Sequence, residues 1–434
     1  MLKTKIMKNS ILILSFLVLN CVGYSQDIPI GCGSDINYEK HLKNHPEAIE
    51  DRKILEEFTE NFVNNYDPYE RTGTKIIPVV FHVNDPSNPE KVTMGQIESA
   101  LQILNEDFSA TNADISDIRP EFVGLIADVE VQFCLASIDP DGNPTTGVTY
   151  HYNSYNGREP DGYGSAVKGV SYWPGDQYLN IWIVNYVEDD GSLYNSGWAY
   201  LPDDWVADNE LDGIVYNHRY LGYEGSSEVS GPESWQAEMA RVLTHEVGHY
   251  LNLHHTFYNY CTPPGDYVDD TPYVYYHGSN NCEQLGTFCS TTSVVMDQNY
   301  MDYTPCPSMY SLGQKARVQA ALNSSIAGRN NLWKESNLVL TGCMIDETGI
   351  QEENRWALEV YPNPATTEIY LNFGFSIENA SVKISNMMGQ LMISENIQAP
   401  TELYSIDLSS LEKGVYIVTA GYDGALRSQI ITIR

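Results

Sequence analysis

The stretch HEVGHYLNLHH runs from His245 to His255 and contains a histidine spacing that suits a metal site. On a helix, His245 and His249 are one turn apart and project from the same face, where two imidazoles can bind one zinc ion. Glu246 lies beside that face and is placed to take a proton from a water molecule that the metal activates. The pattern predicts an active-site helix that carries two zinc ligands and a general base.

The third ligand has to leave the helical path, because a continued helix would rotate it away from the first two. A chain reversal usually needs a residue in the left-handed conformation, and Asn252 is the non-glycine type that best tolerates it. His255 then completes a three-histidine zinc site with one position open for water, and His254 is the weaker candidate for the same role. A purely structural role is the alternative for these imidazoles. The remaining histidines have no partners at ligand spacing: His41, His45, His82, His151, His218 and His277.

Hydrophobic patterns around this stretch predict a mixed α+β domain. Buried strands are expected at TKIIPVVFHV (74–83), VEVQFCLA (129–136), YLNIWIVNYV (178–187) and DGIVYN (212–217). Helices are expected at residues 93–108, 236–252 and 313–322. The segment 261–309 is loop-like and carries four cysteines, so we expect disulfides to stabilise it.

The first 25 residues have the features of a secretory signal peptide. Three lysines precede the apolar run ILILSFLVL (11–19), which is too short to span a bilayer, and cleavage after Ser25 is reasonable. No later stretch reads as a transmembrane anchor. An exported chain favours disulfides among its seven remaining cysteines.

The net charge of −34, from 24 basic and 58 acidic residues, argues against nucleic acid or an anionic membrane surface as a partner. It fits an extracellular protein that binds calcium, and equally a surface that only maintains solubility. We expect a monomer.

The motif HExxHxxxxxH resembles the metzincin zinc motif, and HEVGHYLNLHHTF is similar to the pappalysin family over about residues 30–340. The resemblance implies a metzincin catalytic domain at residues 72–343, with a twisted sheet and an active-site helix. NYMDY (299–303) resembles the Met-turn of the family. Met301 would then form the floor beneath the zinc, and Tyr303 would stabilise the tetrahedral intermediate or move as a gate. A packed aromatic residue is the alternative for Tyr303.

The family resemblance also implies a calcium loop and a set of disulfides. GDYVDDTP is similar to a family calcium loop, with Asp266, Thr271, Asp269 and Asp270 as candidate ligands. A solvated acidic turn is the alternative. The implied disulfides are Cys261–Cys289 and Cys282–Cys306, which leaves Cys134 and Cys343 to pair with each other.

Cys32 lies in the sequence Gly31-Cys32-Gly33, and family propeptides carry a similar Cys-Gly pair. A thiolate is a good fourth zinc ligand that displaces water. We therefore interpret residues 26–71, which are polar and helix-prone with no strand pattern, as a propeptide that is removed near Arg71. An unpaired or differently bridged cysteine is the alternative.

Two departures from the family pattern concern the turn and the specificity. Asn252 replaces the glycine of the family, and Pro305 stands where relatives that cut beside arginine have an acidic residue, so basic-residue specificity is not assumed. LNIWIVNY (179–186) and GWAYLP (197–202) resemble the strand pair at the substrate-binding edge, where an extended peptide can bind through its main chain.

The C-terminal residues 355–434 follow an acidic linker at 344–354 and alternate with a period of two, which predicts a small antiparallel β-sandwich. VYPNPATTEIYL, KGVYIV and the terminal Arg434 resemble the sorting domain of the type IX secretion system of Bacteroidetes. This implies export across the outer membrane, with the secretion machinery as a partner. A carbohydrate- or protein-binding sandwich is the alternative.

The sequence thus predicts a secreted zinc metalloendopeptidase that hydrolyses peptide bonds in proteins and peptides and is made as a latent zymogen. A surface adhesin or binding protein that keeps zinc as a structural clamp is the alternative. Intact Glu246 and Tyr303 argue against that alternative, because a scaffold would need neither.

Overall fold

The computed structural model describes residues 31–155, 164–187, 195–222, 240–275, 289, 294–344, 358–377, 380–386, 390–399, 401–422 and 425–434. The chain forms two compact units, Met1–Met344 and Ile345–Arg434. The predicted signal peptide (1–25) lies outside the described residues, as does the predicted linker from residue 345 onward. In the described part of the chain, no helix has the length and apolar character needed to cross a membrane.

A mixed sheet with seven described strands forms the core of the first unit, in the order β1-β6-β7-β5-β2-β3, with β4 paired to β2. The strands are β1 (Gly31–Cys32), β2 (Lys75–Asn84), β3 (Val131–Leu135), β4 (Val148–His151), β5 (Leu179–Val184), β6 (Asn195–Ala199) and β7 (Ile214–Asn217). The strands β2, β3, β4, β5 and β7 are parallel to one another, whereas β6 is antiparallel to β7. Every residue of β5 is buried, as expected for a strand covered on both faces.

The predicted strands β2, β3, β5 and β7 are confirmed, but the predicted edge pair is wrong. Strand β7 lies between β5 and β6, so the segments 179–186 and 197–202 are not neighbours in the sheet. Strand β1 was not expected, because two residues carry no alternation pattern. It joins the outside of β6 in the parallel direction.

Five longer helices pack around the sheet: α1 (Ser34–Asn44), α2 (Glu47–Val63), α3 (Met94–Phe108), α7 (Val242–Tyr250) and α8 (Leu312–Ala321). Short helices and 3-10 turns connect the elements: η1 (Pro89–Lys91), η2 (Ala113–Asp117), η3 (Val123–Leu125), α4 (Ser165–Lys168), α5 (Asp204–Asp208), η4 (His218–Tyr220), η5 (Ile326–Gly328) and α9 (Glu335–Thr341). The predicted helix at 236–252 corresponds to α7, and residues 231–239 lie outside the described part of the chain. Ser311 and Gln314 form a capping box that fixes the start of α8.

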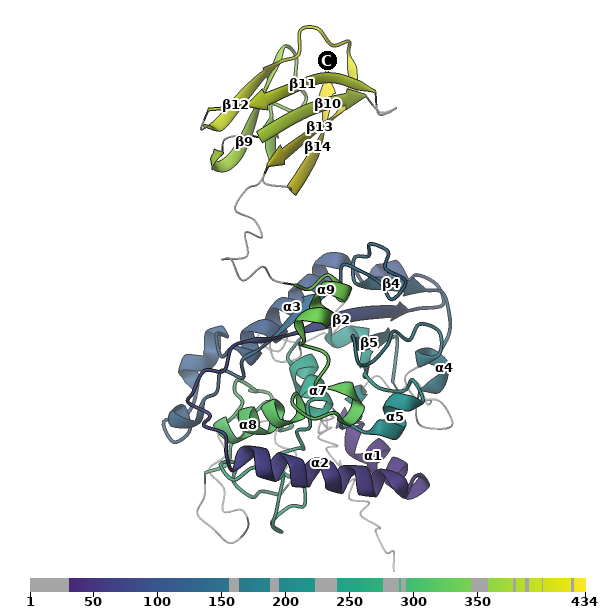
Figure 1. Cartoon of the computed structure of the whole chain (residues 1–434), viewed down its shortest axis with the longest axis vertical. Coiled ribbons are helices and arrows are strands. Elements are labelled where there is room, and N and C mark those ends of the chain that lie inside the picture. The colour runs from purple at the N-terminus through teal and green to yellow at the C-terminus, as the bar shows by residue number, and fades with distance from the viewer. Residues whose placement is uncertain are drawn as a thin grey trace, which may run out of the picture. The chain divides into compact units, whose positions relative to one another are not determined.

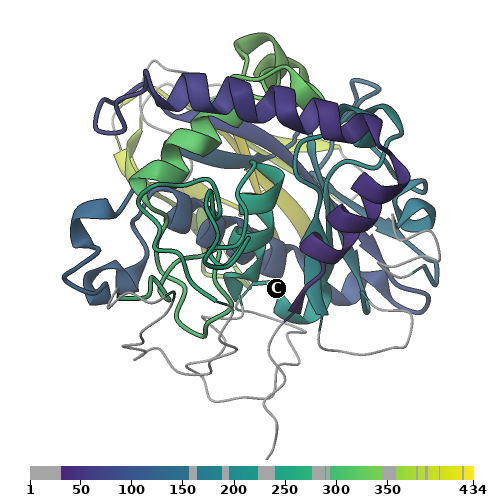
Figure 2. The ribbon, with the colours of Figure 1, turned by 90° about the horizontal axis from the view of Figure 1, so that it is seen from below.

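Residues 31–71, called the N-terminal segment from here on, consist of β1, α1, α2 and the loop that leads to β2. Helix α2 runs alongside α8, and α1 lies next to β6 (Figures 1 and 2). The segment therefore lies across the same side of the first unit as α7 and α8.

The second unit is a β-sandwich of two antiparallel sheets, which confirms the predicted fold class. One sheet has the order β11-β10-β13-β14 and the other β12-β9-β8. The strands are β8 (Glu359–Tyr361), β9 (Glu368–Ile377), β10 (Ala380–Asn386), β11 (Leu391–Ile397), β12 (Thr401–Asp407), β13 (Gly414–Tyr422) and β14 (Ala425–Ile433). Strand β11 was not predicted; it is an edge strand and most of its residues are at least partly exposed.

Candidate active site

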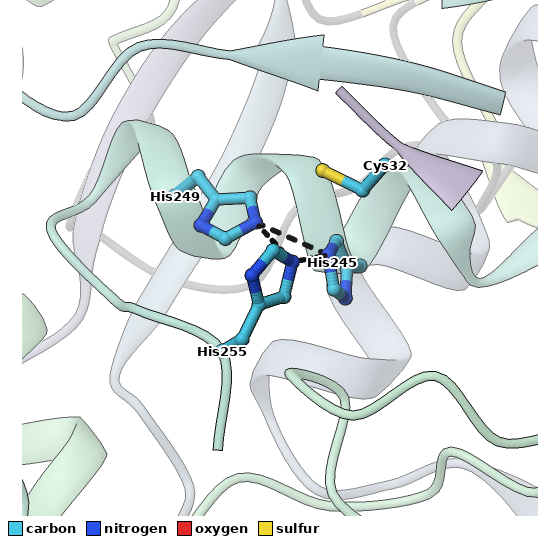
Figure 3. A group of neighbouring side chains, drawn as sticks. All are labelled: Cys32, His245, His249 and His255. Carbon is cyan, nitrogen blue, oxygen red and sulfur yellow. Dashed lines mark hydrogen bonds between the residues drawn. The ribbon is translucent and has the colours of Figure 1, made fainter. Parts of the chain in front are cut away.

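Three imidazole rings converge beneath the sheet edge (Figure 3). His245 and His249 project from α7, and His255 approaches from the loop that follows the helix. The three Nε2 atoms lie 3.1–3.2 Å from one another. Cys32 Sγ belongs to the same group, whose ligand atoms all lie within 4.8 Å of each other.

The Nδ1 atom of each ring, which faces away from the other two rings, already has a hydrogen-bond partner. Each Nδ1 donates to an oxygen 2.7 Å away: His245 to Tyr300 O, His249 to Leu253 O and His255 to Asp35 Oδ2. Burial lowers the pKa of His245 to about 3 and the pKa of His249 well below its usual range. A neutral ring whose Nδ1 donates to an oxygen presents the lone pair of its Nε2 to the other rings. Three lone pairs at this distance repel each other unless a cation lies between them, and three imidazoles beside a thiol suit zinc.

The turn after α7 brings His255 back to the helix. Asn252 has φ 74°, the left-handed conformation, and Leu253 N donates to Gly248 O at 2.9 Å. The side chain of His254 points elsewhere, because its Nε2 lies 2.9 Å from Arg52 Nη2. The weaker candidate for third ligand is therefore outside the group.

A methionine lies directly against the active-site helix. Met301 is fully buried, and a Cβ added to Gly248 would collide with Met301 Sδ and lie 3.1 Å from Tyr310 OH. Glycine at position 248 leaves room for this packing, and a larger residue would force the side chain of Met301 to shift. Residues 299–303 therefore form a floor in contact with the helix that carries two of the histidines.

A buried carboxylate supports the floor and was missed by the sequence analysis. Asp107 accepts hydrogen bonds from Thr244 Oγ1 at 2.6 Å and from Tyr300 OH at 2.8 Å. Burial raises the pKa of Asp107 to about 6, although Arg241 opposes this shift. Asp107 lies on the apolar face of α3, and a charged residue at that helical spacing is the signal that could have identified it.

Glu246 and Tyr303 both face the N-terminal segment. Glu246 Oε2 lies 3.4 Å from Cys32 Sγ and 3.4 Å from Ser34 Oγ, and no hydrogen bond to the buried Oε1 is found among the described residues. Burial raises the pKa of Glu246 to about 8, although the hydrogen bonds from Cys32 and Ser34 lower it. Tyr303 OH donates to Cys32 O at 3.2 Å, and its ring centre is 4.7 Å from that of His255.

Cys32 has a free thiol and is held on the sheet edge by β1. Gly33 N donates to Gly197 O at 3.0 Å, and Ala199 N donates to Ser34 Oγ at 3.0 Å. Burial and the charge of Glu246 raise the pKa of the thiol. Through these contacts the N-terminal segment occupies the outer edge of β6 beside the histidines.

The acidic loop contains a cluster of oxygens around Thr271. Its Oγ1 lies 2.7 and 2.8 Å from the carboxylate oxygens of Asp266 and 2.8 Å from Val268 O. The hydroxyl has one proton to donate, and its oxygen can also accept a hydrogen bond. Burial raises the pKa of Asp266 to about 7, although the Thr271 hydroxyl lowers it.

The other two acidic candidates of this loop make no hydrogen bond with Thr271 among the described residues. Asp269 is exposed, and Asp270 accepts hydrogen bonds from Ser311 Oγ at 2.6 Å and Gly313 N at 2.8 Å. Asp270 therefore binds the start of α8.

Two of the three expected disulfides lie among the described residues, Cys134–Cys343 and Cys261–Cys289. Cys306 is also disulfide-bonded, and its expected partner Cys282 lies outside the described residues.

Comparisons with known proteins match both units. Residues 162–323 match the family model of pregnancy-associated plasma protein-A peptidases, and residues 359–433 match the secretion system C-terminal sorting domain. An extracellular metalloprotease of Arthroderma benhamiae is 26% identical over 262 residues, which are 59% of this chain and 74% of that protein. A Sordaria macrospora extracellular metalloprotease is 32% identical over 155 residues, 33% of this chain and 48% of that one.

Two solved structures from Tannerella forsythia have the same fold as the first unit. Mature mirolysin in complex with a cleaved peptide has a TM-score of 0.54 and 29% identity, covering 62% of this chain and 99% of that one. A promirolysin mutant has a TM-score of 0.60 and 27% identity, covering 71% of this chain and 99% of that one.

The fold, the histidine group and these matches define a metalloprotease. More particularly, the chain is a secreted zinc metalloprotease whose residues 162–323 are similar to the pregnancy-associated plasma protein-A peptidases and whose second unit matches a type IX sorting domain.

Proposed function

We propose that the protease holds its zinc ion through His245, His249 and His255 and uses Glu246 as the general base of peptide-bond hydrolysis. One observation carries this assignment. The three Nε2 atoms converge while an oxygen atom lies 2.7 Å from each Nδ1, and this orientation of the rings supports a cation between them.

When bound, zinc supplies a Lewis acid that polarises water and the scissile carbonyl. Glu246 accepts a proton from the attacking water and passes that proton to the leaving amine. Tyr303 turns its phenol from Cys32 O to the carbonyl oxygen that becomes negatively charged, and stabilises it by donating a hydrogen bond. The outer edge of β6 binds the extended substrate through main-chain hydrogen bonds.

We also propose that the chain is a zymogen in which residues 26–71 are the propeptide and Cys32 is the fourth zinc ligand. Strand β1 uses the β6 edge that the substrate needs, and Cys32 Sγ lies beside the three histidines. A bound cation lowers the pKa of a coordinating thiol, which allows Cys32 to bind as the thiolate. Removal near Arg71, whose side chain is 81% exposed, opens the edge and the fourth position.

Calcium is proposed as a second metal, with Asp266, Thr271 and the carbonyl of Val268 as ligands. Carboxylate, hydroxyl and carbonyl oxygens that lie this close together suit a hard cation. Calcium should raise the thermal unfolding temperature of the wild type more than that of Asp266→Asn. An equal rise in both proteins would contradict the site.

Casein zymography of the processed protein tests the enzymatic assignment. The wild type should clear the substrate, whereas Glu246→Ala and chelator-treated wild type should not, with losses of at least about 10²–10⁴-fold in rate for the variant. Equal clearing by all three samples, or bound zinc without clearing, would reject the protease mechanism, and the second result would favour a binding protein with a structural zinc.

The latency proposal needs a separate experiment with Cys32→Ala. This variant should process itself and gain activity faster than the wild type, because water can reach the metal. A Cys134→Ala/Cys343→Ala double variant, which also removes cysteines but is remote from the site in sequence, serves as the control. Unchanged processing of Cys32→Ala would rule out Cys32 as the zinc ligand that keeps the zymogen inactive.

A further inference from the structure

The three Nδ1 partners of the histidines differ in origin. Tyr300 O and Leu253 O are neutral carbonyls within the catalytic unit. The partner of His255 is the carboxylate of Asp35, which lies 2.7 Å away and belongs to the N-terminal segment, 220 residues earlier in the chain. A carboxylate behind a metal-binding imidazole fixes the orientation of the ring and makes it a stronger ligand.

The N-terminal segment also contacts the turn that carries His255. Arg52 of α2 donates a hydrogen bond to Asn252 Oδ1, and its Nη2 lies 2.9 Å from His254 Nε2. Asn252 is the left-handed residue of the turn. Both the ring of His255 and the backbone that leads to it are therefore restrained by the same removable segment.

An ion pair between α8 and α2 also contacts the turn at Asn252. Arg317 of α8 donates through Nε to Asn252 O at 2.6 Å. Its two terminal nitrogens donate to the carboxylate of Glu56, on α2, with Nη1 at 2.7 Å. The arginine side chain is 2% exposed in this arrangement. The turn is thus enclosed between one arginine of the N-terminal segment and one of the catalytic unit.

We propose that the N-terminal segment organises the zinc site as well as covering it: Asp35 and Arg52 hold the third ligand, so the precursor binds zinc more tightly than the processed enzyme. This inference rests on the proposed function, because it takes the three histidines as the zinc ligands and the segment as removable. It implies that zinc is loaded before processing. It also means that cleavage removes two negative groups from the surroundings of the metal, the Cys32 thiolate and the Asp35 carboxylate.

Zinc affinity, measured by competition with a chromogenic chelator, tests the role of Asp35. The intact precursor carries Glu246→Gln to prevent self-processing and Cys32→Ser to remove the thiol. In this background Asp35→Asn keeps the size and a hydrogen-bond acceptor but removes the charge, and it should weaken zinc binding about tenfold to hundredfold. Asp35→Glu should restore part of the affinity. Glu57→Gln, which removes an exposed charge of α2, should leave it unchanged.

Replacing zinc with cobalt(II) makes the metal site visible by absorption spectroscopy. A purely structural role of Asp35 would leave these absorption bands unchanged. Asp35→Asn should shift the visible absorption bands of the cobalt site, whereas Glu57→Gln should not. Arg52→Met should lower zinc affinity in the same direction as Asp35→Asn, which keeps the inference testable if one variant folds poorly.

Equal zinc affinity in the precursor and the processed enzyme, or unchanged affinity and cobalt spectra in folded Asp35→Asn, would overturn the inference. Because the background lacks the thiol, these outcomes are independent of whether Cys32 is the latency plug. Absence of any zinc binding in all proteins would instead contradict the proposed function.

Discussion

The histidine group lies between two regions that are built differently. The floor consists of α7 and residues 299–303, and eight of the nine residues of α7 are buried. The cover is the N-terminal segment, and only three of the seventeen residues of its main helix, α2, are buried. The cover instead makes polar and charged contacts, such as those of Asp35, Arg52 and Glu56.

This difference matches the proposed function, in which the cover is removed by processing and the floor remains in the mature enzyme. Apolar burial stabilises by about 1.5–3 kcal/mol for each large side chain and is not screened by salt, so we expect the floor to stay folded after processing. The charged contacts of the cover depend on the exclusion of water, because ion pairs contribute only about 0–1 kcal/mol each once they are exposed to solvent. A cover held by such contacts can leave after one or a few cuts while the floor stays in place.

The largest expected loss of stability follows from breaking the buried ion pair at the end of α7. Arg329 is fully buried, donates to Tyr250 O at 3.2 Å and pairs with Asp212 at 2.5 Å. Arg329→Met leaves the Asp212 charge buried and unpaired. It should therefore lower the free energy of unfolding of the first unit by about 3–5 kcal/mol, as measured by urea denaturation. Arg71→Met, which removes an exposed pair, should cost no more than about 1 kcal/mol. Similar losses for both would contradict the comparison, and adding Asp212→Asn to Arg329→Met should recover stability.

An intermediate loss of stability is expected from adding a side chain between α7 and Met301. Gly248→Ala would push a Cβ against Met301 and should destabilise the first unit by about 1–3 kcal/mol while lowering zinc affinity. Gly95→Ala is the matched control, because Gly95 lies in α3 with open space around its Cβ position. That control should stabilise the protein by up to about 1 kcal/mol through helix propensity. Thermal unfolding of both variants measures the difference, and a stabilising Gly248→Ala would show that the floor is not tightly packed.

The smallest effect concerns the cover alone. Glu56→Gln keeps a hydrogen-bond acceptor for the buried Arg317 but removes its charge, and should lower the stability of the precursor by about 1–2 kcal/mol, with faster processing. The processed enzyme should unfold as the wild type does, because residue 56 is no longer part of it. Glu57→Gln on the same helix is the control. A loss of stability that persists after processing would show that the two regions are not separable.

Much of the fold was predictable because the signals are local. The apolar runs of β2 and β5 and the helical spacing in α3 identify their elements without reference to the rest of the chain. The order of the strands was not predictable to the same degree, and the expected neighbours in β5 and β6 are separated by β7. Pairing depends on contacts between distant segments, which periodicity does not encode.

The sequence by itself determined the metal-site spacing, since a helical turn fixes His245 and His249 and a left-handed Asn252 allows His255 to return. It also determined the β-sandwich, through its alternating strands. Only the tertiary structure decided what stands behind each imidazole and why residue 248 is glycine. Two of the Nδ1 partners are backbone carbonyls, which carry no sequence signature, and the third is Asp35 from the other end of the unit. Ligand spacing is a property of one short segment, whereas the shell that orients the ligands is assembled by folding.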